Sequence, residues 1–170
     1  MPTESFEKWS PRVHPAAFVH PGAHLLGDVE IGEEASIWPS AVLRGDQGAI
    51  VIGARTSIQD GSVCHATEHV SRTVIGEQCV VGHRVILHGC QVGNNCLIGM
   101  GSTVMDNVEI GDDSFLAAGS LVPPGKKFPP RSFLVGSPAK LVREVGPKEL
   151  EMIAHGWRAY VDLTRRYRAR

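Results

Sequence analysis

The sequence contains neither a strong charge imbalance nor a long apolar run. Seventeen lysine and arginine residues are matched by 18 aspartate and glutamate residues, so the formal net charge is −1. Near-neutrality gives no electrostatic reason to expect nucleic acid binding. No apolar stretch is long enough for a membrane-spanning helix, and the first nine residues lack the apolar core of a secretion signal. We therefore expect a cytoplasmic protein that binds neither nucleic acid nor membrane.

Cysteine is scarce, and its spacing excludes the common metal motifs. The chain has four cysteines, and a disulfide framework is not expected in the cytoplasm. Cys64 lies on the apolar ladder described below, whereas Cys79 and Cys96 occupy its recurring small positions. These three are expected to be core residues. The pattern leaves Cys90 unassigned.

An apolar residue returns at every sixth position through most of the chain. Two interruptions, at 45–51 and after Cys64, and one five-residue step break the series. The members of this ladder are Val13, Val19, Leu25, Ile31, Ile37, Leu43, Ile52, Ile58, Cys64, Ile75, Val81, Leu87, Val92, Ile98, Val104, Ile110, Leu116 and Val122. Glycine often comes directly after a ladder residue, and a small residue usually stands four positions after the ladder residue.

A period of six fits neither an α-helix nor an ordinary strand. It predicts an all-β fold, a left-handed parallel β-helix of hexapeptide repeats, with glycine at the cramped corners. Three hexads to a coil give about six coils over residues 13–122. Each coil can bury its inner residues only by stacking on the next coil.

The remaining segments complete a single domain. Residues 1–12 form an N-terminal segment, and the proline- and glycine-rich residues 123–146 are expected to be a connecting turn. From 147 to 170 the period changes to threes and fours, which predicts an α-helix packed along the rod. Its apolar stripe consists of Leu150, Ile153, Trp157, Tyr160, Thr164 and Tyr167.

The ladder also determines which histidines can meet. His65 and His88 each follow a ladder residue at the same outward position, one coil apart, or about 4.8 Å for regular stacking. Two imidazoles so placed can converge on one metal ion. His83 belongs to another face, roughly 10 Å away across a corner. We therefore expect a metal site between subunits of a homotrimer, with two histidines from one chain and one from its neighbour.

Further polar residues fall in the same columns. Arg44 lies one coil before His65 with Asp46 two residues on, and Asp60 lies one coil before His83 with Gln59 beside it. For any single histidine, an ordinary surface role is the simpler interpretation. The joint register of the whole set favours a metal centre.

These residues resemble the signature of the γ-class carbonic anhydrases, in particular their short-loop subgroup. The matching motifs are Arg44-Gly45-Asp46, Gln59-Asp60-Gly61 with His65, Gly82-His83-Arg84 with His88, and Gly136-Ser137-Pro138-Ala139-Lys140. The resemblance covers nearly the whole chain. It implies reversible hydration of carbon dioxide to bicarbonate by a zinc-bound hydroxide at subunit interfaces.

The resemblance also implies roles for individual residues. His65, His83 and His88 would bind Zn²⁺, although three imidazoles also suit Co²⁺ or Fe²⁺. Gln59 would orient the water or hydroxide on the metal. The interfacial ion pairs and hydrogen bonds would come from Arg44, Asp46 and Asp60.

The chain departs from the family pattern at the residues that would carry protons from the metal site to solvent. Gln47 stands where active members can carry glutamate, and an amide does not titrate. Glu68 matches another family glutamate implicated in proton transfer, so Glu68 and His69 are candidate proton shuttles. Tyr160 aligns with an asparagine in some members, whereas tyrosine is common in the short-loop subgroup.

Two other functions remain open at this stage. The first is chemistry on coenzyme A esters, by an acyl-CoA transferase or a metal-dependent thioesterase. Hexapeptide acyltransferases usually need one general-base histidine, so three histidines at metal spacing argue against a plain transferase. The second is a non-catalytic assembly subunit with a vestigial site, although no ligand is missing here.

Overall fold

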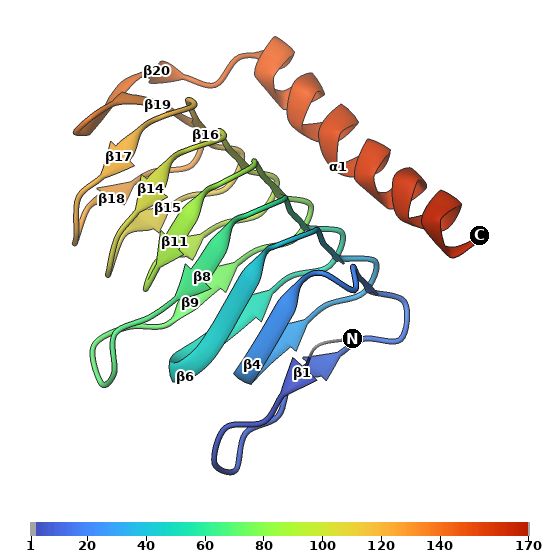
Figure 1. Ribbon diagram of the computed structural model, residues 1–170. Coiled ribbons are helices and arrows are strands. Elements are labelled where there is room, and N and C mark those ends of the chain that lie inside the picture. Colours follow the sequence, from blue (N-terminus) through green and yellow to red (C-terminus); the bar gives the residue numbers. More distant parts are fainter. Residues whose placement is uncertain (1–2, 170) are drawn as a thin grey trace.

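The structure, a computed structural model, describes residues 3–169 as a three-sided rod with one helix along its side (Figure 1). A 12-stranded sheet wraps two faces of the rod and an 8-stranded sheet forms the face beneath the helix. Strands of successive coils pair in parallel. The predicted left-handed parallel β-helix of hexapeptide repeats with a C-terminal helix is therefore confirmed.

We name the three faces in the order in which the repeat crosses them from residue 12 onward. The first face contains β2 (Arg12–Val13), β9 (Thr73–Ile75), β12 (Gln91–Val92), β15 (Glu109–Ile110) and β18 (Lys127–Phe128). The second contains β3 (Phe18–Val19), β5 (Ser36–Ile37), β7 (Ser57–Ile58), β10 (Val80–Val81), β13 (Leu97–Ile98), β16 (Phe115–Leu116), β19 (Ser132–Gly136) and β20 (Ala139–Glu144). The third contains β1 (Thr3–Glu4), β8 (Val63–His65), β11 (Ile86–His88), β14 (Thr103–Val104) and β17 (Leu121–Val122). The long strands β4 (His24–Ile31) and β6 (Val42–Ile52) bend from the third face to the first.

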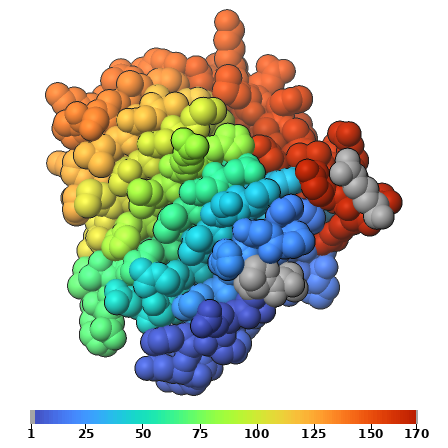
Figure 2. Space-filling model, in the orientation of Figure 1, coloured from blue at the N-terminus to red at the C-terminus, as the bar shows by residue number. Residues whose placement is uncertain are grey.

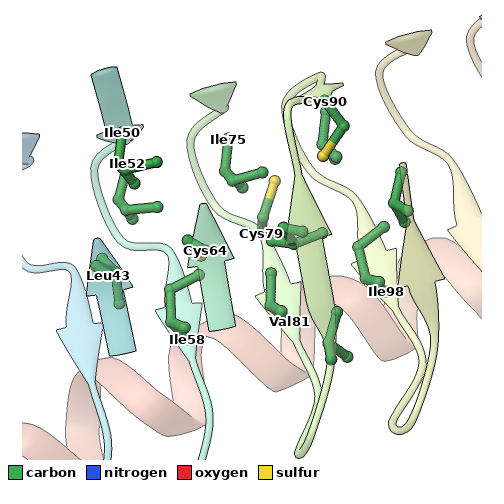
Figure 3. Close-up of a cluster of buried hydrophobic side chains, with 14 of the residues drawn as sticks. Leu43, Ile50, Ile52, Ile58, Cys64, Ile75, Cys79, Val81, Cys90 and Ile98 are labelled. Atoms are coloured by element: carbon green, nitrogen blue, oxygen red, sulfur yellow. The ribbon is translucent and has the colours of Figure 1, made fainter. Parts of the chain in front are cut away.

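The ladder residues fill the interior of the rod. Ile58, Val81 and Ile98 are fully buried and stack in consecutive coils, as Figure 3 shows. The expected core cysteines are buried as well, and so is Cys90, which the repeat left unassigned. Burial raises the pKa of the Cys64 thiol to about 12, so that thiol stays protonated near neutral pH.

The rod has about seven turns rather than the six expected. Phe128 lies opposite Ile110, and Leu134 lies opposite Leu116, so the ladder continues beyond residue 122. The prediction of a connecting turn over 123–146 is wrong for this part of the segment, because its prolines occupy coil corners and do not end the repeat. β20 then turns back antiparallel to β19 and closes the rod. At the other end, β1 of the N-terminal segment pairs with β4.

The glycines that follow ladder residues are needed for close approach of the next coil. A Cβ on Gly99 would collide with the backbone nitrogen of Ala118 and come within 2.7 Å of the carbonyl carbon of Ala117. Backbone with positive φ occurs elsewhere in the coil, for example at Glu34 (53°) and Arg55 (58°). The corners therefore tolerate non-glycine residues, and the spacing between coils requires the glycines.

The helix α1 (Pro147–Arg168) runs back along the second face against β5 and β10. Glu149 accepts a hydrogen bond from the Gly146 amide at 2.8 Å, which satisfies one of the free N–H groups near the helix start. Ile153, Val161 and Thr164 are its buried residues, and its close contact with β10 is at Gly156 beside Val80. Within residues 3–169, no helix is both long and apolar enough to cross a bilayer.

We predict that Gly99→Ala lowers the free energy of unfolding by about 1–3 kcal/mol, because the added methyl group overpacks two stacked coils. Gly22→Ala is the matched control, since its Cβ would meet only the His20 ring, at 3.3 Å. Urea unfolding followed by circular dichroism measures both variants. Equal midpoints for the two variants would contradict the close-approach explanation.

Candidate metal centre

His65 and His88 form a facing pair on the third face. β8 and β11 place the two residues directly opposite one another in adjacent coils. Nδ1 of His65 lies 3.2 Å from Nε2 of His88, and the rings meet at an interplanar angle of 64°. The sequence prediction that these two histidines occupy the same outward position in adjacent coils of one face is therefore confirmed.

A carboxylate stands behind each imidazole. Asp46 Oδ1 lies 3.1 Å from Nε2 of His65, and Asp106 Oδ2 lies 2.9 Å from Nδ1 of His88. A carboxylate only accepts hydrogen bonds, so each of these ring nitrogens carries the proton. In the neutral rings the two facing nitrogens then both present lone pairs. Such a contact needs a shared proton or a metal ion between the nitrogens, and carboxylate-backed imidazoles suit a metal.

Arg44 reinforces the Asp46 side of the pair. Its guanidinium donates to Asp46 Oδ2 at 2.7 Å. Burial alone would raise the pKa of Asp46, but hydrogen bonds from Arg44 and His65 outweigh it and hold that pKa below its ordinary value. Asp46 therefore stays ionised near neutral pH and keeps the proton of His65 on Nε2.

The two histidines differ in their exposure. The His65 side chain is 11% exposed and that of His88 is 32% exposed. Burial, followed by the charge of Arg44, lowers the pKa of His65 despite its hydrogen bond to Asp46. Neutral imidazole is the form that binds a metal ion.

His83 pairs with Asp60 at a different place on the rod. Its Nδ1 lies 3.0 Å from Asp60 Oδ2, so Nδ1 carries the proton and Nε2 keeps the lone pair of the neutral ring, and both side chains are about half exposed. Within residues 3–169, no three His, Cys, Asp or Glu side chains are grouped so that they could hold a metal ion. Gln59, the neighbour of Asp60, is 5% exposed.

Tyr160 reaches this region from the helix. Its ring packs against Trp38 with ring centroids 5.4 Å apart. Burial, and then the negative charge of Asp60, raises the pKa of Tyr160. The phenol therefore keeps its proton and can act as a hydrogen-bond donor.

Glu68 and His69 lie on the loop of residues 66–72, which joins β8 to β9. Their side chains are 65% and 90% exposed, and they contact each other at 3.7 Å. In Figure 2 this light-green loop and the dark-blue segment that follows residue 2 project on either side of the β6 bend. Both residues line a cleft of about 280 Å³ together with Trp9, Asp46 and Gln47. Through Asp46, this cleft borders the paired histidines.

The sequence analysis missed Asp106. The five-residue step from Leu87 to Val92 makes the spacing between these two coils 17 residues, so the repeat places Met105 in line with His88 and Asp106 one residue further on. The hexad count therefore gave no signal for Asp106 as a partner of His88. Burial would raise the pKa of Asp106, but hydrogen bonds from Ser71 and His88 outweigh it and the pKa is lowered. Asp106 thus stays ionised and supports His88 as Asp46 supports His65.

Comparisons with known proteins place the fold in a family. The model described as "Bacterial transferase hexapeptide (six repeats)" matches residues 10–45, 72–104 and 89–124. The carnitine operon protein CaiE of Escherichia coli K12 is 43% identical over 162 residues, which cover 95% of this chain and 82% of that protein.

Two solved structures resemble the rod over nearly its full length. A Bacillus cereus protein provisionally named an acetyltransferase superposes with a TM-score of 0.95 at 36% identity, covering 98% of this chain and 96% of its own. A hexapeptide transferase family protein from Anaplasma phagocytophilum gives 0.93 at 41% identity, covering 97% of each chain. These similarities do not support the expected carbonic anhydrase activity and favour the transferase-like alternative. The chain belongs to the hexapeptide-repeat transferase family.

Proposed function

We propose that this chain is a metal-dependent enzyme that acts on acyl-CoA thioesters at sites between the subunits of a homotrimer. His65 and His88 of one subunit and His83 of the partner subunit would bind the ion. The observation that carries the proposal is the pair of ring nitrogens 3.2 Å apart, each ring held from behind by a carboxylate. Three neutral imidazoles suit Zn²⁺, and also Co²⁺ or Fe²⁺.

The substrate class rests on the family. Among the relatives described above, one carries the provisional name of an acetyltransferase and another that of a hexapeptide transferase family protein. A bound metal ion would supply Lewis acidity toward a carbonyl group and would lower the pKa of water. A thioester carbonyl is a suitable electrophile for that chemistry, and the acyl acceptor can be water or a second substrate.

The surrounding residues would hold this arrangement in place. Asp46 and Asp106 set the tautomers of the two imidazoles, which fixes the direction of their lone pairs. Arg44 keeps Asp46 ionised. Tyr160, whose pKa is raised by burial and by the nearby charge of Asp60, would offer its hydroxyl proton as a hydrogen-bond donor.

Glu68 and His69 are the proposed route for protons between the site and solvent. Both are exposed on the loop beside the cleft that Asp46 lines. Their flexible, solvated side chains suit proton exchange with water.

A second candidate is the hydration of carbon dioxide. One observation favours it: the three histidines occur together with Arg44 and Gln59 in the arrangement that resembles the γ-class carbonic anhydrases. The same centre would then act on a smaller electrophile. The two candidate functions differ in their substrate, so an assay of thiol release and an assay of carbon dioxide hydration distinguish them.

The division of ligands predicts metal complementation between variants. His83→Ala and His88→Ala, each deficient in metal binding alone, should regain about one Zn²⁺ site in four after subunit exchange at equal amounts. An intact site needs a His83→Ala chain to supply His65 and His88 and a neighbouring His88→Ala chain to supply His83. Random assembly of equal amounts brings these two chains together, in this order, at about one interface in four. Metal analysis of the exchanged trimers measures it.

A matched mixture provides the control for this experiment. His65→Ala mixed with His88→Ala should recover no sites, because both ligands must come from the same chain. Recovery in the control mixture, or no recovery in the first mixture despite verified exchange, would refute the two-plus-one division.

The function is tested by coenzyme A release. Zn²⁺-loaded wild type should liberate free thiol from acetyl-CoA, in water alone or with a panel of amine and hydroxyl acceptors. His83→Ala should lower the rate at least about 100-fold, because metal ligation is lost.

A stopped-flow assay of carbon dioxide hydration on the same samples separates the second candidate. Hydration faster than with free Zn²⁺, without thiol release, would favour carbonic anhydrase activity and overturn the acyl-CoA proposal. Thiol release that persists in His83→Ala would show that the proposed metal centre is not needed.

A further inference from the structure

Asp106 contacts two elements that are separate in the sequence. Its Oδ2 accepts the hydrogen bond from Nδ1 of His88 at 2.9 Å, and its Oδ1 accepts the hydroxyl of Ser71 at 2.5 Å. Ser71 belongs to the loop of residues 66–72, which joins β8 to β9. One carboxylate therefore joins an imidazole of the paired histidines to a loop that projects from the rod.

The loop closes on the same hydroxyl. The Thr67 amide donates to Ser71 Oγ at 3.0 Å, and the Ser71 amide donates back to the Thr67 carbonyl at 3.1 Å. Since a hydroxyl has a single proton, and Ser71 gives it to Asp106, the turn and the carboxylate share one hydrogen-bonded chain.

The hydrogen bond between Ser71 and Asp106 requires a glycine at position 89, because a side chain there would occupy the same space. A Cβ on Gly89 would collide with both Asp106 Oδ1 and Ser71 Oγ, and Gly89 has a φ of 65°. Gly89 also donates its amide to Thr73 Oγ1 at 2.9 Å, while the Thr73 hydroxyl donates to the His65 carbonyl at 2.6 Å. The end of the loop is thus attached to both coils that carry the paired histidines.

We propose that Asp106 is a positioning residue that couples the orientation of His88 to the closed conformation of loop 66–72, so that metal binding and loop order strengthen each other. The proposal rests on the metal centre proposed above. It does not depend on which substrate is used there.

The direction of the coupling follows from hydrogen-bond chemistry. His88 keeps its proton on Nδ1, and that N–H would be a stronger donor to Asp106 if the Nε2 lone pair bound a metal ion. Asp106, held by His88, is then in place to accept the Ser71 hydroxyl. By thermodynamic linkage, a closed loop must raise metal affinity by the same factor by which metal favours closure.

This coupling would reach the candidate proton shuttles. Glu68 and His69 lie on the coupled loop, which borders the cleft of about 280 Å³ and, on its other side, a cleft of about 360 Å³ lined by Ser71, Arg72 and Asn107. The shape of both clefts would therefore depend on the state of the metal centre.

Hydrogen exchange of the full chain, with and without Zn²⁺, tests the coupling. In the wild type, Zn²⁺ should slow amide exchange of residues 66–72 by about tenfold, within the usual range of coupling between sites. Ser71→Ala should remove this response and raise the Kd for Zn²⁺, measured by chelator competition, by the same factor. Its histidines and Asp106 are unchanged, so a direct loss of ligands does not explain such a rise.

Two carboxylate variants complete the experiment. Asp106→Asn should remove the loop response and raise the Kd for Zn²⁺ by about 10- to 100-fold. Asp112→Asn is the matched control, because Asp112 accepts a backbone amide from Asn94 at 2.7 Å and, within residues 3–169, forms no hydrogen bond or ion pair with a histidine. It should leave both measurements unchanged.

The outcomes distinguish the coupling from the centre itself. Tight Zn²⁺ uptake with loop exchange that does not respond, or an unchanged Kd in Ser71→Ala, would overturn the coupling alone. Failure of the wild type to take up Zn²⁺ would overturn the proposed centre and the coupling together.

Discussion

The parallel hydrogen bonding of one coil to the next is the constraint on which the rest of this structure depends. It holds residues at equivalent hexad positions opposite one another, as with Cys64 and Leu87 inside the rod. The residue after each of them must then point outward, so that His65 and His88 face each other as a consequence of core packing. The positions of functional side chains on this rod are therefore fixed by the strand register of its core.

Polar residues in neighbouring coils hydrogen-bond to the paired histidines and set which ring nitrogen carries the proton. Each paired imidazole has its own carboxylate, Asp46 or Asp106, and these two sit on opposite sides of the pair. The result is a set of lone pairs directed at one point, with a proton held on the far side of each ring. His83 with Asp60 repeats the motif elsewhere on the rod, which is why the proposed centre needs a second subunit.

The comparisons constrain function less tightly than they constrain fold. Relatives that cover almost the whole chain are a carnitine operon protein and a protein provisionally named an acetyltransferase, and the family is that of hexapeptide transferases. A plain transferase of this kind has no need for two carboxylate-backed histidines in contact. The proposed acyl-CoA enzyme with a metal centre would account for both the family and the geometry.

By itself, the sequence determined the rod, its interior and the opposition of His65 and His88, because a strict six-residue period translates directly into register. It missed the seventh turn, since the prolines near Phe128 resemble a linker when pairing with β15 is unknown. Only the tertiary structure decided the partners of the histidines and the attachment of Ser71 to Asp106. Those contacts depend on side-chain rotamers and on a loop that has no repeat, and periodicity carries no information about either.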